Sequence, residues 1–80
     1  MRKTILRISA VCAESGLPKS TVYHRIAHGL WTSPVKLGPR TVGWPSDEAA
    51  ALNAARIAGK TDDEIRALVV QLETARKAAA

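Results

Sequence analysis

The 80-residue sequence lacks several features that define other classes of protein. It has one cysteine, Cys12, so no internal disulfide can form, and this fits a reducing cytoplasm. Cys12 falls in a predicted helix, where we expect a small core residue. No apolar run approaches the ~18 residues of a membrane span. No apolar segment follows Arg2 and Lys3, so we expect neither a membrane helix nor a signal peptide.

Aromatic residues and catalytic groupings are also scarce. Phe is absent, and of the few aromatic side chains we expect Trp31 and Trp44 in the core. The sequence has no Ser/His/Asp or Cys/His arrangement with supporting context, and no glycine-rich phosphate loop. His24 and His28 have a metal-ligand spacing, but no third ligand is evident. We therefore expect neither an enzyme nor a bound metal or cofactor.

Acidic residues are nearly missing from the first part of the chain. Residues 1–45 contain seven Lys and Arg but one acid, Glu14, whereas residues 46–80 contain five basic and six acidic residues. A surface that is merely solvated would mix the two signs more evenly. The excess favours a polyanionic partner for the N-terminal part and leaves the C-terminal part with another purpose.

The stretch from Gly16 to Gly29 has the pattern of a helix-turn-helix. We predict a short helix over residues 10–15, capped by Ser9 and ended by Gly16. A second helix is predicted over residues 19–28, and Gly29 ends it. Such a pair of helices is typical of proteins whose second helix enters a DNA groove.

A β-hairpin is predicted directly after the second helix. Residues 35–37 alternate like a half-buried strand, and residues 41–44 form a second strand-like run. The tight-turn signal of residues 38–40 lies between them and places Arg40 at the tip. A hairpin that follows a recognition helix is a wing. Residues 5–8 are apolar enough for a short strand or for a lead-in that packs on the core.

Two further helices are predicted in the C-terminal part. Ser46 is expected to cap the third, which runs to about residue 58 with its first-turn acids at the favourable end of the helix dipole. Its expected inward residues are Ala49, Leu52, Ala55 and the stem of Arg56. Thr61 and Glu64 form a capping box for the fourth, which runs to about Lys77. Its apolar stripe is Ile65, Leu68, Val69 and Leu72. The sequence leaves open whether this stripe closes the core of its own chain or binds a second copy.

Several of these segments resemble the AlpA family of prophage regulators, which belongs with the excisionase-like and MerR-type winged helices. The resemblance covers about residues 5–58, and it rests on Ser20-Thr21-Val22-Tyr23, Gly29, Pro34-Val35-Lys36-Leu37-Gly38-Pro39-Arg40 and Val42-Gly43-Trp44. It implies a mainly α fold with a small β-hairpin wing: a winged helix-turn-helix. We expect residues 1–80 to form a single such domain, with residues 61–77 as an additional C-terminal helix.

The predicted DNA contacts lie on the recognition helix and the wing. They are Lys19, Ser20, Thr21, Tyr23, His24, Arg25, Lys36 and Arg40. For Lys19 and Ser20, at the start of the helix, we favour DNA contact over capping, whereas Thr21 can serve as a cap alone. Tyr23 is equally suited to contact phosphate or to pack under the wing.

The basic and imidazole side chains have alternatives of their own. His24 stands where relatives often have Arg, and it can donate to phosphate or guanine or remain solvated. Arg25 is the strongest candidate for guanine or phosphate, with an ion pair to Glu14 as the alternative. Arg40 suits the minor groove or a phosphate, and Lys36 suits the backbone. A solvated hairpin is the alternative for these two residues.

The sequence therefore predicts sequence-specific binding to double-stranded DNA by a cytoplasmic protein that joins the nucleoid when bound. The resemblance implies a role on mobile DNA: regulating integrase or excision genes, or acting as an excisionase (recombination directionality factor). It also implies integrase as a partner and self-association on DNA, as a dimer or a head-to-tail array. The sequence does not separate these roles. The alternative class is a protein-interaction module, such as an antirepressor, that uses the acidic-leaning C-terminal part.

Overall fold

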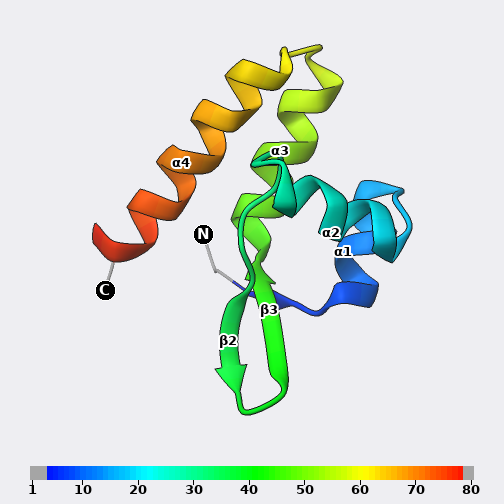
Figure 1. Cartoon of the computed structure of the whole chain (residues 1–80), viewed down its shortest axis with the longest axis vertical. Coiled ribbons are helices and arrows are strands. Elements are labelled where there is room, and N and C mark those ends of the chain that lie inside the picture. The colour runs from blue at the N-terminus through cyan, green and yellow to red at the C-terminus, as the bar shows by residue number, and fades with distance from the viewer. Residues whose placement is uncertain (1–3, 79–80) are drawn as a thin grey trace.

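A computed structural model describes residues 4–78, which form four helices and a small antiparallel sheet (Figure 1). The elements in chain order are β1 (Ile5–Leu6), α1 (Ile8–Ser15), α2 (Lys19–Ala27), β2 (Val35–Gly38), β3 (Thr41–Pro45), α3 (Ser46–Ile57) and α4 (Asp62–Ala78). Helix α3 lies between the α1–α2 pair and α4, and the β2–β3 hairpin projects from the helices (Figure 1). This is the predicted winged helix-turn-helix. Arg2 and Lys3, which contribute to the basic excess, lie outside the described residues.

Glycines end the first two helices, as predicted. Helix α1 stops at Gly16. At the end of α2, the Leu30 N–H donates to the Arg25 carbonyl at 2.8 Å and the Gly29 N–H donates to the Ile26 carbonyl at 3.2 Å. Gly29 has φ +73°, a conformation that a Cβ disfavours. These paired bonds are a Schellman motif, and they turn Leu30 back against the core.

Both predicted serine caps are wrong. Helix α1 begins at Ile8, ahead of Ser9, with no side-chain bond at its N-cap. Ser46 is the first residue inside α3. Its hydroxyl accepts from the Thr4 N–H at 3.1 Å, and its own N–H donates to the Thr4 carbonyl at 2.7 Å. The Ser46 hydroxyl therefore joins the N-terminal segment to α3, because a partner distant in sequence occupies it.

The sheet has the strand order β1-β3-β2, so the central strand is the second strand of the hairpin. Residues 5–6 pair with the end of β3, so the strand expected over residues 5–8 forms in its first half only, while Ile8 already begins α1. The hairpin closes through the two-residue turn Pro39–Arg40, as predicted. In β3, Val42 and Trp44 contribute to the core, and Gly43 between them faces the opposite side of the sheet.

Gly43 is required by close approach rather than by its backbone angles. A Cβ at this position would collide with the Ile5 side chain, and it would lie 3.0 Å from the Leu6 carbonyl oxygen and 3.1 Å from Leu37 Cδ1. The neighbouring strand β1 therefore lies so close to the Gly43 backbone that only glycine fits there.

The core draws residues from every helix and from β3. It consists of Val11, Val22, Trp31, Trp44, Ala49, Leu52, Ala55, Ile65 and Val69. The prediction that both tryptophans are core residues is confirmed, and Cys12 and Leu17 pack partly buried against the same cluster. Ile65 and Val69 are 1% and 5% exposed, so the stripe of α4 closes the core of its own chain.

The fourth helix starts as its sequence predicts. The Thr61 N–H donates to Glu64 Oε1 at 2.9 Å, and the Glu64 N–H donates to Thr61 Oγ1 at 3.2 Å, which confirms the capping box. Arg56 near the end of α3 is half-buried and pairs with Asp62 at 3.2 Å. None of the helices within residues 4–78 is long and apolar enough to cross a membrane.

Candidate nucleic-acid interface

Helix α2 presents a polar outer face over a narrow apolar stripe. Val22 is fully buried and Ile26 packs partly buried against the core, while Lys19, Ser20 and His24 are exposed. The N-cap residue is a proline, and no side chain caps the first turn. The exposed first turn therefore keeps backbone N–H groups available for an anion, next to the short Ser20 side chain. Thr21, which is half-buried, makes no side-chain cap bond here either.

Tyr23 lies on the flank of α2 that faces the wing. Its ring meets the ring of Trp44 edge-on, with centroids 6.2 Å apart at 65°. The side chain is nevertheless 39% exposed. Tyr23 therefore packs against the base of the wing and still reaches solvent. Packing under the wing is thus compatible with the predicted phosphate contact.

His24 and His28 form a pair of rings at the outer surface of α2. Their centroids are 4.2 Å apart, and both residues are exposed. Within residues 4–78 there is no group of three or more His, Cys, Asp or Glu side chains that could hold a metal ion. His28 was not among the predicted contacts, although its spacing from His24 places it one turn further along the same surface.

Arg25 lies on the other flank of α2, toward the junction of α3 and α4. Partial burial, and next the nearby Arg56 guanidinium, lower the pKa of Arg25 from its ordinary value, while Asp62 opposes that shift. No ion pair joins Arg25 to Glu14 in the described part of the chain. Arg25 and Tyr23 therefore lie on opposite flanks of α2, and only Tyr23 faces the wing. The order of the residues in the sequence does not reveal this separation.

The wing carries two exposed cations, and Lys36 lies on the same side of the molecule as Tyr23. Lys36 pairs across the hairpin with Val42, and paired residues of antiparallel strands share a face. Val42 and Trp44 define that face, and Tyr23 packs on Trp44. Arg40 is exposed in the turn at the tip, where the hairpin extends beyond the helices (Figure 1).

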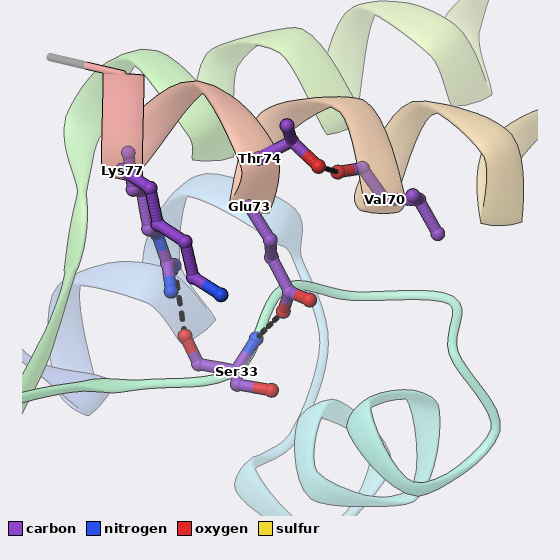
Figure 2. Close-up of a pocket in the computed structure, with 6 residues that line it drawn as sticks. Ser33, Val70, Glu73, Thr74 and Lys77 are labelled. Carbon is purple, nitrogen blue, oxygen red and sulfur yellow. Dashed lines mark hydrogen bonds between the residues drawn. The ribbon is translucent and has the colours of Figure 1, made fainter.

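Two residues of α4 hold the base of the wing, and sequence reasoning missed them. We call Glu73 and Arg76 the α4 clamp. The Ser33 N–H donates to Glu73 Oε2 at 2.7 Å, and an Arg76 guanidinium N–H donates to the Ser33 carbonyl at 2.8 Å. Figure 2 shows the Glu73 carboxylate turned toward the Ser33 amide. Ser33 lies in the loop that joins α2 to β2, so α4 contacts the chain just before the wing.

Arg76 also pairs with a buried acid. Its Nε and a terminal nitrogen donate to the two carboxylate oxygens of Glu48 at 2.7 and 2.5 Å. The Glu48 side chain is 4% exposed. Hydrogen bonding to Glu48 raises the pKa of Arg76 above its ordinary value, although burial opposes the shift. Glu48 stands at helical spacing from the inward Leu52 and Ala55, and this signal could have identified it as an inward position.

The comparisons with known proteins agree with this geometry. The model of the family described as prophage CP4-57 regulatory protein (AlpA) matches residues 4–51, which include α1, α2, the wing and the start of α3. A protein of Enterobacteria phage P4, described as uncharacterized protein ORF88, is 37% identical over 59 residues, which cover 74% of this chain and 67% of that protein. No solved structure gives a significant match. The chain therefore belongs to the AlpA family of prophage regulatory proteins.

Proposed function

We propose that this chain binds double-stranded DNA sequence-specifically, with α2 in the major groove and the wing on the adjoining backbone or minor groove. The family is one of DNA-binding regulators, and this supports DNA as the partner. The proposal rests on how the charges are distributed over the fold.

Most basic residues of α3 and α4 form ion pairs with carboxylates of the same chain, whereas those of α2 and the wing form none within residues 4–78. In the part of the chain that the structure describes, ion pairs engage four cations of α3, α4 and their junction: Arg56, Lys60, Arg66 and Arg76. No described ion pair engages Lys19, Arg25, Lys36 or Arg40. Carboxylates of the same chain thus neutralise most of the C-terminal cations and leave those of α2 and the wing for an external anion. Unpaired cations around a helix-turn-helix support binding to DNA phosphates.

Each predicted contact residue then has a role that fits its position. Lys19 and the first turn of α2 hold a phosphate, and Ser20 and His24 reach base edges from the outer face. Lys36 and Arg40 contact the DNA from the wing. Arg25 lies on the flank away from the wing, where we assign it a phosphate on the far side of the groove. Tyr23 positions the wing through Trp44 and contacts phosphate with its exposed part. Thr21, half-buried in the first turn of α2, adds a phosphate contact at the start of the helix.

The biological role follows from the family in general terms. We propose that the chain acts in the cytoplasm, on nucleoid or phage DNA, either as a regulator of integrase and excision genes or as an excisionase with integrase as its partner. Several copies bound side by side would serve the second role. Because α4 buries its apolar stripe within its own chain, such an assembly would have to use another surface.

Charge reversal tests the DNA-binding proposal. The probe is a short duplex selected from a random-sequence library by the wild-type chain, and affinity is measured by fluorescence anisotropy over a range of salt concentrations. We expect Arg25→Glu and Arg40→Glu each to lower affinity at least about tenfold and to reduce the dependence of log affinity on log salt. Lys77→Glu makes the same charge change on α4 and should alter affinity less than about threefold. Binding that survives both arginine reversals at physiological salt would refute the proposal.

Footprinting separates the two biological roles. The same chain is tested on an integrase promoter and on an attachment site of the element that carries it. One compact protected site at the promoter indicates regulation. An array of protected direct repeats at the recombination site indicates excision.

A further inference from the structure

We propose that α4 is a positioning element for the wing. Glu73 and Arg76 fix the base of the hairpin relative to α2 and thereby determine how much the Arg40 contact contributes to the affinity for DNA. This inference rests on the proposed DNA binding. It assigns α4 a part in recognition, although α4 lies beyond the residues that the family model matches.

The loop between α2 and β2 is held by side chains rather than by secondary structure. Both backbone polar groups of Ser33 bond to the α4 clamp, at 2.7 and 2.8 Å. The carbonyl of Thr32, a fully buried residue, accepts from the Trp44 indole N–H at 2.9 Å. Consecutive residues of the loop are therefore fixed from two directions, by α4 through Ser33 (Figure 2) and by β3 through Thr32.

The Arg76 guanidinium also fixes the point at which the chain leaves the hairpin. Arg76 bonds to Ser33, which precedes β2, and to Glu48, which lies in the first turn of α3 directly after β3. The pair with Glu48 is largely shielded from water, since that side chain is 4% exposed. One side chain thus joins the two points at which the chain enters and leaves the wing.

Helix α4 also contacts the end of the recognition helix. Arg66 Nε donates to the His28 carbonyl at 3.0 Å, at the C-terminus of α2. An α-helix rises 1.5 Å per residue, so Arg66 and Arg76 are separated by about 15 Å along α4. The helix therefore bridges the start and the end of the loop between α2 and the wing, and its rigidity sets the distance between them.

A small movement at the base becomes a large movement at the tip. A strand rises about 3.3 Å per residue, so the chain from Val35 to Arg40 spans about 16 Å, and a tilt of about 10° at the base moves the tip by about 3 Å. A displacement of that size breaks a hydrogen bond to a phosphate or base. The clamp is therefore placed to control the contact that Arg40 makes.

A double-mutant cycle tests this inference. Affinity for the selected duplex is measured for Arg40→Ala in the wild-type background and in the backgrounds Glu73→Ala and Glu73→Gln. The two Glu73 variants change the net charge equally, but the glutamine amide oxygen can still accept from the Ser33 N–H. We expect Arg40→Ala to lower affinity about tenfold in the wild-type and Glu73→Gln chains, but less than about threefold in the Glu73→Ala chain.

A second background covers the case in which Glu73→Ala does not fold. Arg76→Lys keeps a cation beside Glu48 but cannot bond to Glu48 and Ser33 in the same way, because it lacks the guanidinium fork. The cycle with Arg40→Ala is repeated there, and circular dichroism melts confirm that each variant is folded at the assay temperature.

The outcomes are distinct. A tenfold loss from Arg40→Ala in every background overturns the positioning role of α4 and leaves the proposed DNA binding intact. No loss from Arg40→Ala in the wild-type background shows instead that the wing contact is absent, so the proposed binding mode fails and this inference fails with it. A purely structural role for α4 predicts additive losses, whereas positioning predicts the non-additive result.

Discussion

Replacement of Arg76 by alanine should destabilise the fold more than any other single change to a surface charge. The change removes the cation that pairs with the Glu48 carboxylate, a side chain that is 4% exposed in the intact protein. Breaking a buried ion pair costs about 3–5 kcal/mol. The Arg76 side chain is 24% exposed, so water screens part of the interaction. We therefore expect a loss of about 2–3 kcal/mol in the free energy of unfolding.

Urea unfolding followed by circular dichroism measures this loss. For a domain of this size about 1 kcal/mol corresponds to a shift of about 4–8 °C in Tm, so Tm should fall by about 10–20 °C. Lys77→Ala removes the exposed cation next along α4 and should change the free energy by less than about 0.5 kcal/mol. The double variant Glu48→Leu with Arg76→Met should recover most of the loss, because it removes both charges. If Arg76→Ala unfolds at the same urea concentration as Lys77→Ala, the buried pair does not stabilise the fold as we argue.

Three other changes test separate parts of the fold. Gly43→Ala should cost about 1–3 kcal/mol in urea unfolding, because the added Cβ meets the strand β1 backbone; equal stability would contradict the close approach. Trp44→Phe should cost about 1–3 kcal/mol by the same measurement, since it leaves the buried Thr32 carbonyl without its donor. Hydrogen bonds from Thr61 lower the pKa of Glu64 from 4.5, so the capping box stabilises α4 above pH 4.5 and is lost as pH falls through the folded-state pKa. Acid titration of helicity should therefore be flatter in Glu64→Gln, and identical titrations would contradict the capping box.

The elements that the sequence predicts correctly depend on neighbours in the chain. Gly16 and Gly29 end their helices because a left-handed residue is needed there, whatever the rest of the fold does. The capping box of Thr61 and Glu64 is a contact between residues of one helical turn. The hairpin follows from a tight turn between two alternating segments. Local chemistry was sufficient for all of these.

The errors and omissions share a different origin. Ser46 has the chemistry of a cap, yet its hydroxyl bonds to Thr4, a residue far away in the sequence. The sequence predicts Glu48 as a first-turn acid that favours the helix dipole, whereas its carboxylate is buried because α4 places Arg76 against it. No local pattern identifies such partners.

For the candidate site, the sequence predicts correctly that most contact residues are exposed. It predicts less well on which side of α2 each of them lies. The recognition helix and wing form as expected, and most of the predicted contacts reach solvent. Arg25 is the main revision, because Arg56 and Asp62 place it on the flank away from the wing. The sequence could not reveal this, since the flank depends on how α3 and α4 pack beside α2. The contacts themselves stay a prediction until binding is measured.

The strand order β1-β3-β2 leaves β2 at the edge of the sheet. An edge strand carries unsatisfied backbone groups that another chain can pair with, and this is a common route to aggregation. Lys36 lies in the middle of this edge, and the register shifts between Lys36 and Gly38, which interrupts the regular spacing that a second strand needs. Proline flanks the strand on both sides, at Pro34 and Pro39. Lys36, which we assign to a DNA phosphate, thus has a second role. In the free protein its charge disfavours edge-to-edge pairing of β2 with the same strand of another copy.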